Sequence, residues 1–158
     1  MNPGDHEMAG TANIRVRRAT ALSAAVSKRM GGIRQHGTAP ELAVRRLLSS
    51  LRVRYRTKNR DLPGSPDLAN RRRRFAVFVH GCFWHRHEGC ARTTMPKNNA
   101  PFWRAKFVDN VARDSRASAI LRAGGYRVLT IWECETTTPA QLGALRGRLA
   151  KLRSRPSN

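Results

Sequence analysis

The sequence predicts a single α/β domain in which a mixed sheet of about four strands is flanked by helices. Its 158 residues suffice for one domain with its own hydrophobic core. Apolar residues make up 40% of the chain and charged residues 26%, proportions typical of a globular protein. Helical and strand patterns follow one another in the order α, α, β, β, β, α, β, α, which favours helices packed on a mixed sheet.

Four segments have the start and stop signals of helices, namely 20–30, 38–51, 101–123 and 139–152. The first precedes a pair of glycines, and the third lies between a cap at Asn99 or Ala100 and a second glycine pair. The fourth begins at Pro139. The second carries an apolar stripe expected to face the core, formed by Leu42, Leu47, Leu48 and Leu51.

Four further segments predict strands, namely 53–57, 67–69, 75–79 and 126–132. In the segment 53–57, residues of the strand type alternate with arginine, the period-two pattern of a half-buried strand. The LPGSPD sequence at 62–67 is rich in turn-forming residues. The run Arg71–Arg74 separates two strands, so we expect a hairpin tip that is either simply solvated or in contact with phosphate.

The two ends of the chain are expected to lie outside the domain. Residues 1–19 are polar, lack periodicity and end in a basic run, so they predict a flexible basic arm. Residues 20–152 form the predicted domain, and 153–158 a disordered tail. No stretch reaches the roughly 18 consecutive apolar residues of a membrane span, and the N-terminus lacks the apolar core of a secretory signal. We therefore expect a cytoplasmic protein with no membrane partner.

The charge balance indicates a polyanionic partner. The chain has 31 Lys and Arg residues against 10 Asp and Glu, which gives a net charge of +21. Nucleic acid is the most common partner of such a surface, because each neutralised phosphate releases counterions. An arginine-rich composition can also reflect a GC-rich genome, but that bias alone does not deplete acidic residues so strongly.

The cysteines and neighbouring histidines predict a metal site. Three cysteines are an odd number, which argues against a closed disulfide framework. Zinc requires four soft or borderline ligands in a tetrahedron, and a closed site of this kind is structural. The alternative is that the cysteines are buried small residues or free thiols. The predicted ligands of a Cys₃His zinc site are Cys82, His87, Cys90 and Cys134.

Two histidines remain once zinc is satisfied. His80 ends an apolar strand and His85 lies between zinc ligands, so both can be held rigidly, as a general acid or base requires. Asp67 begins the strand that precedes them, where a carboxylate can ligate Mg²⁺ and present it to a phosphodiester. Its alternative role is as part of a turn.

Two further acids are candidates for the same site. Glu41 stands three residues after Thr38, so it is either a helix-capping residue or an acid near the site, and both roles are compatible. Asp114 shares a helix face with Trp103 and Phe107, which points its carboxylate toward the sheet. An inward acid needs a partner, and a nearby imidazole is suitable. The alternative is an ordinary surface aspartate.

Taken together, these blocks resemble the Vsr mismatch endonucleases over residues 20–152. The blocks are HGCFWH at 80–85, LPGSPD at 62–67, FW followed by NVARD at 110–114, and WEC at 132–134. The resemblance implies a restriction-endonuclease-like α/β core and a structural zinc. It also implies Mg²⁺-dependent nicking of double-stranded DNA on the 5′ side of the thymine of a T:G mispair. Such mispairs arise by deamination of 5-methylcytosine, and nicking initiates very short patch repair.

The resemblance also implies roles for individual residues. Asp67 and the backbone carbonyl of Val79 match the Mg²⁺ ligands, and His80 and His85 the active-site histidines, with Asp114 and Glu41 as supporting acids. The zinc ligands match as predicted above. Phe83 and Trp84 match aromatics that wedge into the base stack beside the mispair, and Met30 a residue inserted from the opposite groove. At least one of the two adjacent aromatics is expected to be exposed. The resemblance further implies a nucleoid-associated monomer with repair proteins as partners.

Two departures and two alternatives accompany this interpretation. Val79 stands where relatives can have Thr. Glu88-Gly89 makes the gap between His87 and Cys90 one residue longer than in some relatives. The first alternative is a zinc-stabilised basic protein that binds structured nucleic acid without cutting it. The second is a nuclease of the same fold with broader mismatch preference. A Mg²⁺-dependent nicking assay over all mismatches and flanking sequences discriminates among the three.

Overall fold

A computed structural model describes residues 37–154 of the protein. The predicted basic arm, the predicted helix at 20–30 and Met30 lie outside the described residues, as do residues 155–158. The described elements are α2 (Ala39–Ser50), β1 (Leu68–Asn70), β2 (Phe75–His80), α3 (Ala100–Ala123), β3 (Arg127–Trp132), the 3-10 helix η1 (Glu133–Thr136), α4 (Pro139–Ala150) and the 3-10 helix η2 (Lys151–Arg153). Three predicted helices and three predicted strands are thereby confirmed, with bounds shifted by one or two residues.

The sheet of the described residues has three strands in the order β1-β2-β3, so the expectation of about four strands is wrong for this part of the chain. β1 and β2 are antiparallel and β2 and β3 are parallel, which confirms a mixed sheet. The missing strand is the one predicted at 53–57, of which only the bridge between Arg56 and Ala69 forms. The Arg56 carbonyl accepts both the Ala69 N–H of the bridge and the Asn59 side-chain amide, which also donates to the Pro66 carbonyl, so the bridge leads into a closed loop. On the other side of the bridge, the Arg54 carbonyl accepts from the Asn70 side chain and not from a backbone N–H.

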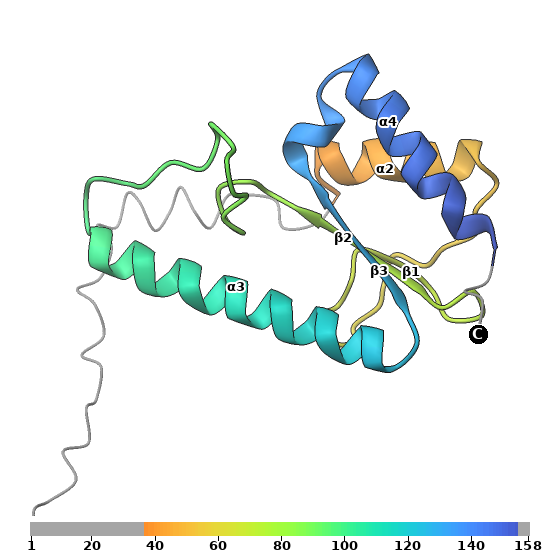
Figure 1. The fold of residues 1–158 in the computed structure, drawn as a ribbon, viewed down its shortest axis with the longest axis horizontal. Helices are drawn as coiled ribbons and strands as arrows, with labels where there is room; N and C mark the ends of the chain where they lie inside the picture. Colours follow the sequence, from red (N-terminus) through yellow and green to blue (C-terminus); the bar gives the residue numbers. More distant parts are fainter. Residues whose placement is uncertain (1–36, 155–158) are drawn as a thin grey trace, which may run out of the picture.

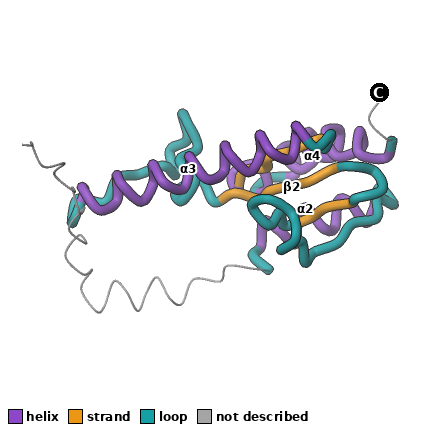
Figure 2. Tube along the Cα trace, turned by 90° about the horizontal axis from the view of Figure 1, so that it is seen from below, coloured by secondary structure: helices purple, strands orange, loops and turns teal. Residues whose placement is uncertain are grey.

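The sheet lies between two helical layers, with α2 and α4 on one face and α3 on the other (Figure 1). The larger core fills the space between the sheet and the α2/α4 layer, and includes Leu48, Phe75, Ile131 and Leu149. A smaller cluster beneath α3 joins Phe78 to Ala117 and Leu121. Figure 2 shows that α3 continues well beyond the sheet at its N-terminal end. No helix in the described range 37–154 is long and apolar enough to cross a membrane.

The buried face of α2 differs in part from the predicted leucine stripe. Leu48 is fully buried, but Leu42 is 40% exposed, and Val44 takes the central core position. The reason is helical phase, because Val44 and Leu48 are four residues apart and so lie on one face. The Arg71–Arg74 run forms the turn between β1 and β2, as predicted.

Candidate active site and metal centre

The parallel pairing of β2 and β3 places two cysteines at the same edge of the sheet. Cys82 follows the end of β2, and Cys134 lies in η1, directly after β3. The loop after β2 turns back through His87 and Cys90 with backbone hydrogen bonds from His87 to Cys82 and from Cys90 to His87. The sulfur or nitrogen atoms of Cys82, His87, Cys90 and Cys134 all lie within 4.8 Å of one another.

This cluster fits a tetrahedral zinc ion. Zinc bonds of about 2.3 Å to sulfur and about 2.0–2.1 Å to nitrogen place such ligand atoms about 3.5 Å apart. The Nδ1 atom of His87 is 3.7 Å from the sulfur of Cys82 and 3.3 Å from that of Cys134. The His87 ring is stacked on Trp132, with centroids 4.3 Å apart and planes at 9°, so its orientation is set by packing. Burial raises the pKa of the Cys134 thiol to about 12, so a bound cation is what would make it a thiolate ligand.

A second cluster forms beside the first from His80, His85 and Asp114. The imidazole rings of His80 and His85 are stacked, with centroids 3.8 Å apart and planes at 9°. His85 Nδ1 is 2.5 Å from a carboxylate oxygen of Asp114 on α3. Because a carboxylate can only accept, the Nδ1–H group of His85 is the donor, which leaves its Nε2 atom as the acceptor when the ring is neutral. The sequence prediction that Asp114 has an imidazole partner is therefore confirmed.

His80 is neutral at physiological pH. Its side chain is buried at the end of β2, with 8% of the residue exposed. Burial and, to a lesser extent, the neighbouring His85 lower the pKa of His80 to about 4, although Asp114 acts in the opposite direction. A neutral imidazole can both donate and accept hydrogen bonds, whereas an imidazolium can only donate.

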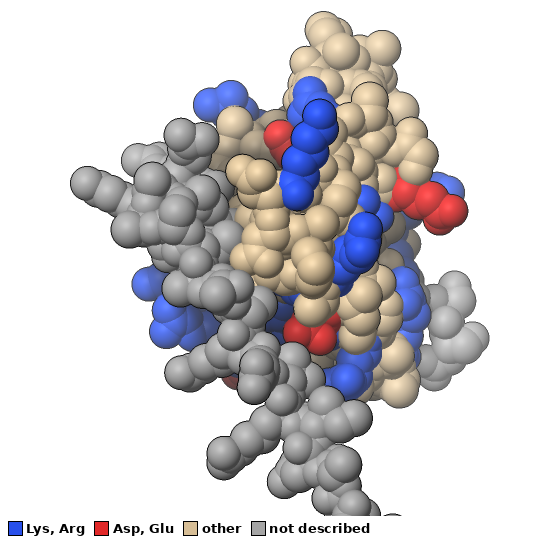
Figure 3. Space-filling model, turned by 90° about the vertical axis from the view of Figure 1, so that its left-hand side faces the viewer, with Lys and Arg blue, Asp and Glu red and all other residues tan. Residues whose placement is uncertain are grey.

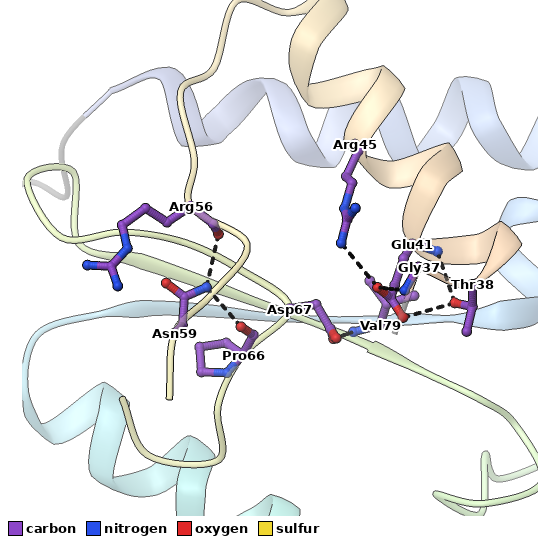
Figure 4. A network of polar contacts seen from close by, with 9 residues as sticks. All are labelled: Gly37, Thr38, Glu41, Arg45, Arg56, Asn59, Pro66, Asp67 and Val79. Atoms are coloured by element: carbon purple, nitrogen blue, oxygen red, sulfur yellow. Dashed lines mark hydrogen bonds and ion pairs between the residues drawn. The ribbon is translucent and has the colours of Figure 1, made fainter. Parts of the chain in front are cut away.

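Asp67 directly precedes β1, beside the end of the neighbouring strand β2. Its carboxylate accepts a hydrogen bond of 2.7 Å from the backbone N–H of Val79 (Figure 4). This contact joins the two residues that the sequence analysis assigned to Mg²⁺. A carboxylate has two oxygens with about four lone-pair sites, so this hydrogen bond is compatible with metal coordination. Neither cluster of possible metal ligands includes Asp67.

Glu41 caps the start of α2. The Thr38 hydroxyl accepts from the Glu41 backbone N–H, and the Glu41 carboxylate accepts from the Gly37 N–H at 2.9 Å and the Thr38 hydroxyl at 3.1 Å (Figure 4). The predicted capping role is thus confirmed. Glu41 is only 3% exposed, and Arg45 compensates its charge at 3.3 Å.

Phe83 and Trp84 are both half-buried, so the expectation that one of them would be exposed is wrong. The loop can turn both rings partly toward protein because α3 extends beyond the sheet and packs against one side of them. Phe83 makes edge contacts with Trp103 and Phe107 of α3, at centroid distances of 5.7 and 5.2 Å, and Trp84 lies 5.9 Å from Trp103. The two adjacent rings also contact each other edge to face at 5.1 Å.

The structure adds two residues that the sequence analysis did not single out for this site. Asn110 donates from its side-chain amide to the Trp84 carbonyl at 3.1 Å, one helical turn before Asp114. Asn110 and Asp114 are four residues apart and so lie on one face of the helix, which was a sequence signal for the role of Asn110 in this site. Trp132 stacks on His87 and also contacts His80 edge to face at 5.5 Å. It thus connects the two clusters, and no sequence signal indicated this contact.

The surroundings of the site are basic. Figure 3 views the end of the molecule that carries the loop after β2 and the first turns of α3, and shows Lys and Arg side chains outnumbering acidic ones there. A histidine pair with an orienting carboxylate, a nearby cluster of possible metal ligands and a basic surface are features of a hydrolase that acts on a phosphodiester. The site therefore defines the class as a candidate nuclease.

Comparisons with known proteins identify the family. The family described as DNA mismatch endonuclease Vsr matches residues 22–92. The chain is 46% identical over 123 residues to the Type II nicking enzyme V.XorIIP of Xanthomonas oryzae pv. oryzae, and this match covers 78% of the chain and 88% of that protein. It is 38% identical over 122 residues to DNA mismatch endonuclease Vsr of Escherichia coli, and this match covers 77% of the chain and 72% of that protein. The chain belongs to the Vsr family, and this membership supports DNA endonuclease function.

Proposed function

We propose that the protein is a Mg²⁺-dependent DNA mismatch endonuclease that nicks one strand on the 5′ side of the thymine in a T:G mispair. The observation that carries this proposal is the stacked pair His80 and His85 with Asp114 hydrogen-bonded to one ring. A zinc-stabilised binding protein needs no such arrangement. The names of the relatives in the Vsr family support the choice of a mismatched duplex as substrate.

Asp67 and the Val79 backbone carbonyl are the proposed ligands of Mg²⁺, and Glu41 is a supporting acid near the site. When bound, Mg²⁺ supplies Lewis-acid polarisation of the scissile phosphate. The Val79 N–H holds the Asp67 carboxylate in a defined orientation, at 2.7 Å. Position 79 contributes its backbone carbonyl, which every residue type has. Valine can therefore supply the same ligand as the Thr that relatives can have there.

His85 is the proposed group that takes a proton from the attacking water. Asp114 accepts from His85 Nδ1–H at 2.5 Å and thereby leaves Nε2 with its lone pair. The carboxylate also stabilises the imidazolium that forms when the proton arrives. The water oxygen bonds to phosphorus as the bond to the leaving oxygen breaks, and the leaving oxygen takes up a proton from solvent. His80, neutral and stacked on His85, donates a hydrogen bond to the developing negative charge.

The aromatic pair is the proposed sensor of the mispair. Phe83 and Trp84 wedge into the base stack, with Met30 inserted from the opposite groove. The contacts with Trp103 and Phe107 support this role, because the base stack is forced to open only if the wedge itself does not move. Unstacking costs a few kcal/mol per step and is least costly at a mispair, so a rigid wedge favours mispaired sites.

The four-ligand Cys₃His cluster is proposed to bind one structural zinc ion. Four protein ligands complete the tetrahedron, so the site has no open position for a reacting water. The ion would connect the ends of β2 and β3 and hold the loop that carries both His85 and the aromatic pair. Its proposed contribution to catalysis is therefore indirect.

The decisive experiment is a nicking assay on end-labelled duplexes with each mismatch in several flanking sequences, with Mg²⁺ or with chelator. We expect Mg²⁺-dependent cleavage of T:G duplexes only. Asp67→Asn should abolish nicking and keep binding of the same duplex, whereas Asp61→Asn, which removes an exposed carboxylate six residues earlier, should keep both. Binding without cleavage under all conditions would favour the non-catalytic alternative, and equal cleavage of several mismatches would favour the broader nuclease.

A further inference from the structure

A hollow of about 440 Å³ lies along the outer edge of β3, away from the candidate active site. It is bounded by the C-terminal end of α3, by the first half of β3 and by the last turn of α4 with η2. Figure 1 shows β3 between α4 and α3 at this end of the molecule. The lining residues on which the inference depends are Arg122, Tyr126, Arg127, Val128, Arg148 and Lys151.

The hollow is remote from the nicking site. Arg127 is the first residue of β3, and Trp132, which contacts His80, is the last. A strand rises about 3.3 Å per residue, so the two ends of β3 are about 17 Å apart. A ligand in the hollow therefore occupies a separate site.

The cationic side chains of the hollow divide into two fixed and two available groups. Arg127 donates to the backbone carbonyls of Lys151 and Ser154, and Arg148 to Glu135 and to the Thr130 carbonyl at 3.0 Å. The side chains of Arg122 and Lys151 are exposed, and among residues 37–154 they form no hydrogen bond or ion pair. No acidic residue lines the hollow. The hollow thus offers two exposed positive charges that other described residues do not neutralise.

The floor of the hollow presents a backbone donor and acceptor beside an aromatic ring. The Arg127 N–H donates to the Arg74 carbonyl, so the odd-numbered residues of β3 direct their backbone groups toward β2. Backbone direction alternates along a strand, so the N–H and C=O groups of Val128 point to the open edge. Tyr126, two residues earlier and half-buried, places its ring in the same wall. A donor beside an acceptor is complementary to the hydrogen-bonding edge of a nucleobase.

We propose that this hollow is a second nucleotide-binding site, which takes a phosphate on Arg122 and Lys151 and the attached base against Tyr126. The backbone groups of Val128 pair with the base edge. Aromatic stacking together with a positively charged groove is the general means by which proteins hold single-stranded nucleic acid. The occupant is therefore a nucleotide or a single-stranded DNA segment, in which the base is free to leave its own stack.

A peptide strand added to β3 is the competing occupant, and the structure disfavours it. The Arg148 guanidinium occupies the Thr130 carbonyl, which a pairing strand would need. Covering an edge with a charged side chain is a common way to prevent strand addition. The remaining open backbone is too short for a peptide ladder but sufficient for one base.

The test is an NMR titration of the full-length protein labelled on its two tyrosine rings. Inorganic phosphate, thymidine, thymidine 5′-monophosphate and a thymidine tetranucleotide are added in turn. We expect the nucleotide and the tetranucleotide to shift the Tyr126 signals and leave those of Tyr55 in place, with weaker binding of phosphate or nucleoside alone. The signals are assigned with Tyr55→Phe.

Charge and ring variants complete the test. Arg122→Gln with Lys151→Gln should weaken nucleotide binding by about tenfold or more, since two charge-assisted contacts are lost. Arg46→Gln with Arg60→Gln removes the same charge from exposed positions outside the hollow and should leave binding within twofold. Tyr126→Ala should weaken nucleotide binding and leave phosphate binding unchanged.

Three results would overturn the proposal. The first is equal binding of phosphate and nucleotide with no effect of Tyr126→Ala. The second is displacement of the nucleotide by a saturating short mismatched duplex, which would place the ligand at the nicking site. The third is a shift of the Tyr126 signals only by an acidic peptide. Nicking by the Arg122/Lys151 variant should equal that of the parent, so failure here is distinguishable from failure of the proposed endonuclease function.

Discussion

Replacement of Asp114 by Asn tests the proposed proton relay most directly. The change keeps the size of the side chain and removes the charge that faces His85 Nδ1 at 2.5 Å. The carboxylate is only 25% exposed and the imidazole 28%, so solvent screens the contact only in part. A hydrogen bond to a charged group contributes about 1.5–3 kcal/mol. Its loss in the transition state corresponds to a decrease in the nicking rate of about 10- to 100-fold.

The assay is single-turnover nicking of a labelled T:G duplex at saturating enzyme, which isolates the chemical step from product release. Binding of the duplex should stay within twofold of the parent, because the basic surface is unchanged. The melting temperature should change by at most about 4 °C, since a partly exposed ion pair contributes little to stability. Bound zinc, measured by elemental analysis, should remain at one ion per chain.

Asp109→Asn is the matched control, because Asp109 is an exposed acid on the same helix, five residues before Asp114. It should nick at the parental rate. A parental rate in Asp114→Asn would refute the relay, since the chemistry would then not depend on the carboxylate. An equal loss in both variants would show that the effect comes from helix charge and not from the contact with His85.

Three further predictions concern the metal, the turn before β1 and the aromatic wedge. Removing zinc with a strong chelator should unfold or destabilise the domain, measured by circular dichroism; a native spectrum in zinc-free protein would contradict a structural role. Gly64→Ala should lower the free energy of unfolding by about 2–4 kcal/mol in a urea titration, because Gly64 has φ +72° and a Cβ there would lie 2.6 Å from the Cβ of Ala117. Gly143→Ala is the control: Gly143 has open space around it, so this change should not lower the free energy of unfolding in the same titration. Trp84→Ala should keep zinc and salt-sensitive binding to paired DNA and lose the preference for T:G in a competition assay; unchanged discrimination would exclude the wedge, and loss of zinc would assign the ring to structure.

Much of the candidate metal centre was predictable from sequence because its residue types are chemically distinctive. Cysteine and histidine at short spacing after one apolar strand, with a further cysteine after another, are typical of a shared metal site. Parallel strands end at the same edge of a sheet, so the pairing of β2 with β3 was enough to bring Cys82 and Cys134 together. The partner of Asp114 was predictable for a related reason, because an acid on the inward face of a helix requires compensation.

Other features could not be predicted because they depend on non-local packing. The alternation at 53–57 is typical of a strand, but only Arg56 pairs with the sheet, and the Arg54 carbonyl accepts from the Asn70 side chain instead of from a backbone N–H. At least one of two adjacent aromatics on a tight loop was expected to be exposed, yet α3 is long enough to pack against both Phe83 and Trp84. Leu42 looked like a core residue by type, and helical phase gave its place to Val44.

The sequence by itself determined three of the helices, three of the strands, the residue types of the candidate metal cluster and the basic character of the protein, because these follow from local periodicity, ligand chemistry and charge. Only the tertiary structure decided the orientation of the functional groups. The stacking of His80 on His85, the contact of Trp132 with His87 and the hollow beside β3 each join residues from separate elements. Such contacts depend on the angle and distance at which a strand, a loop and a helix meet, and those are set by the packing of the whole core and not by any one segment.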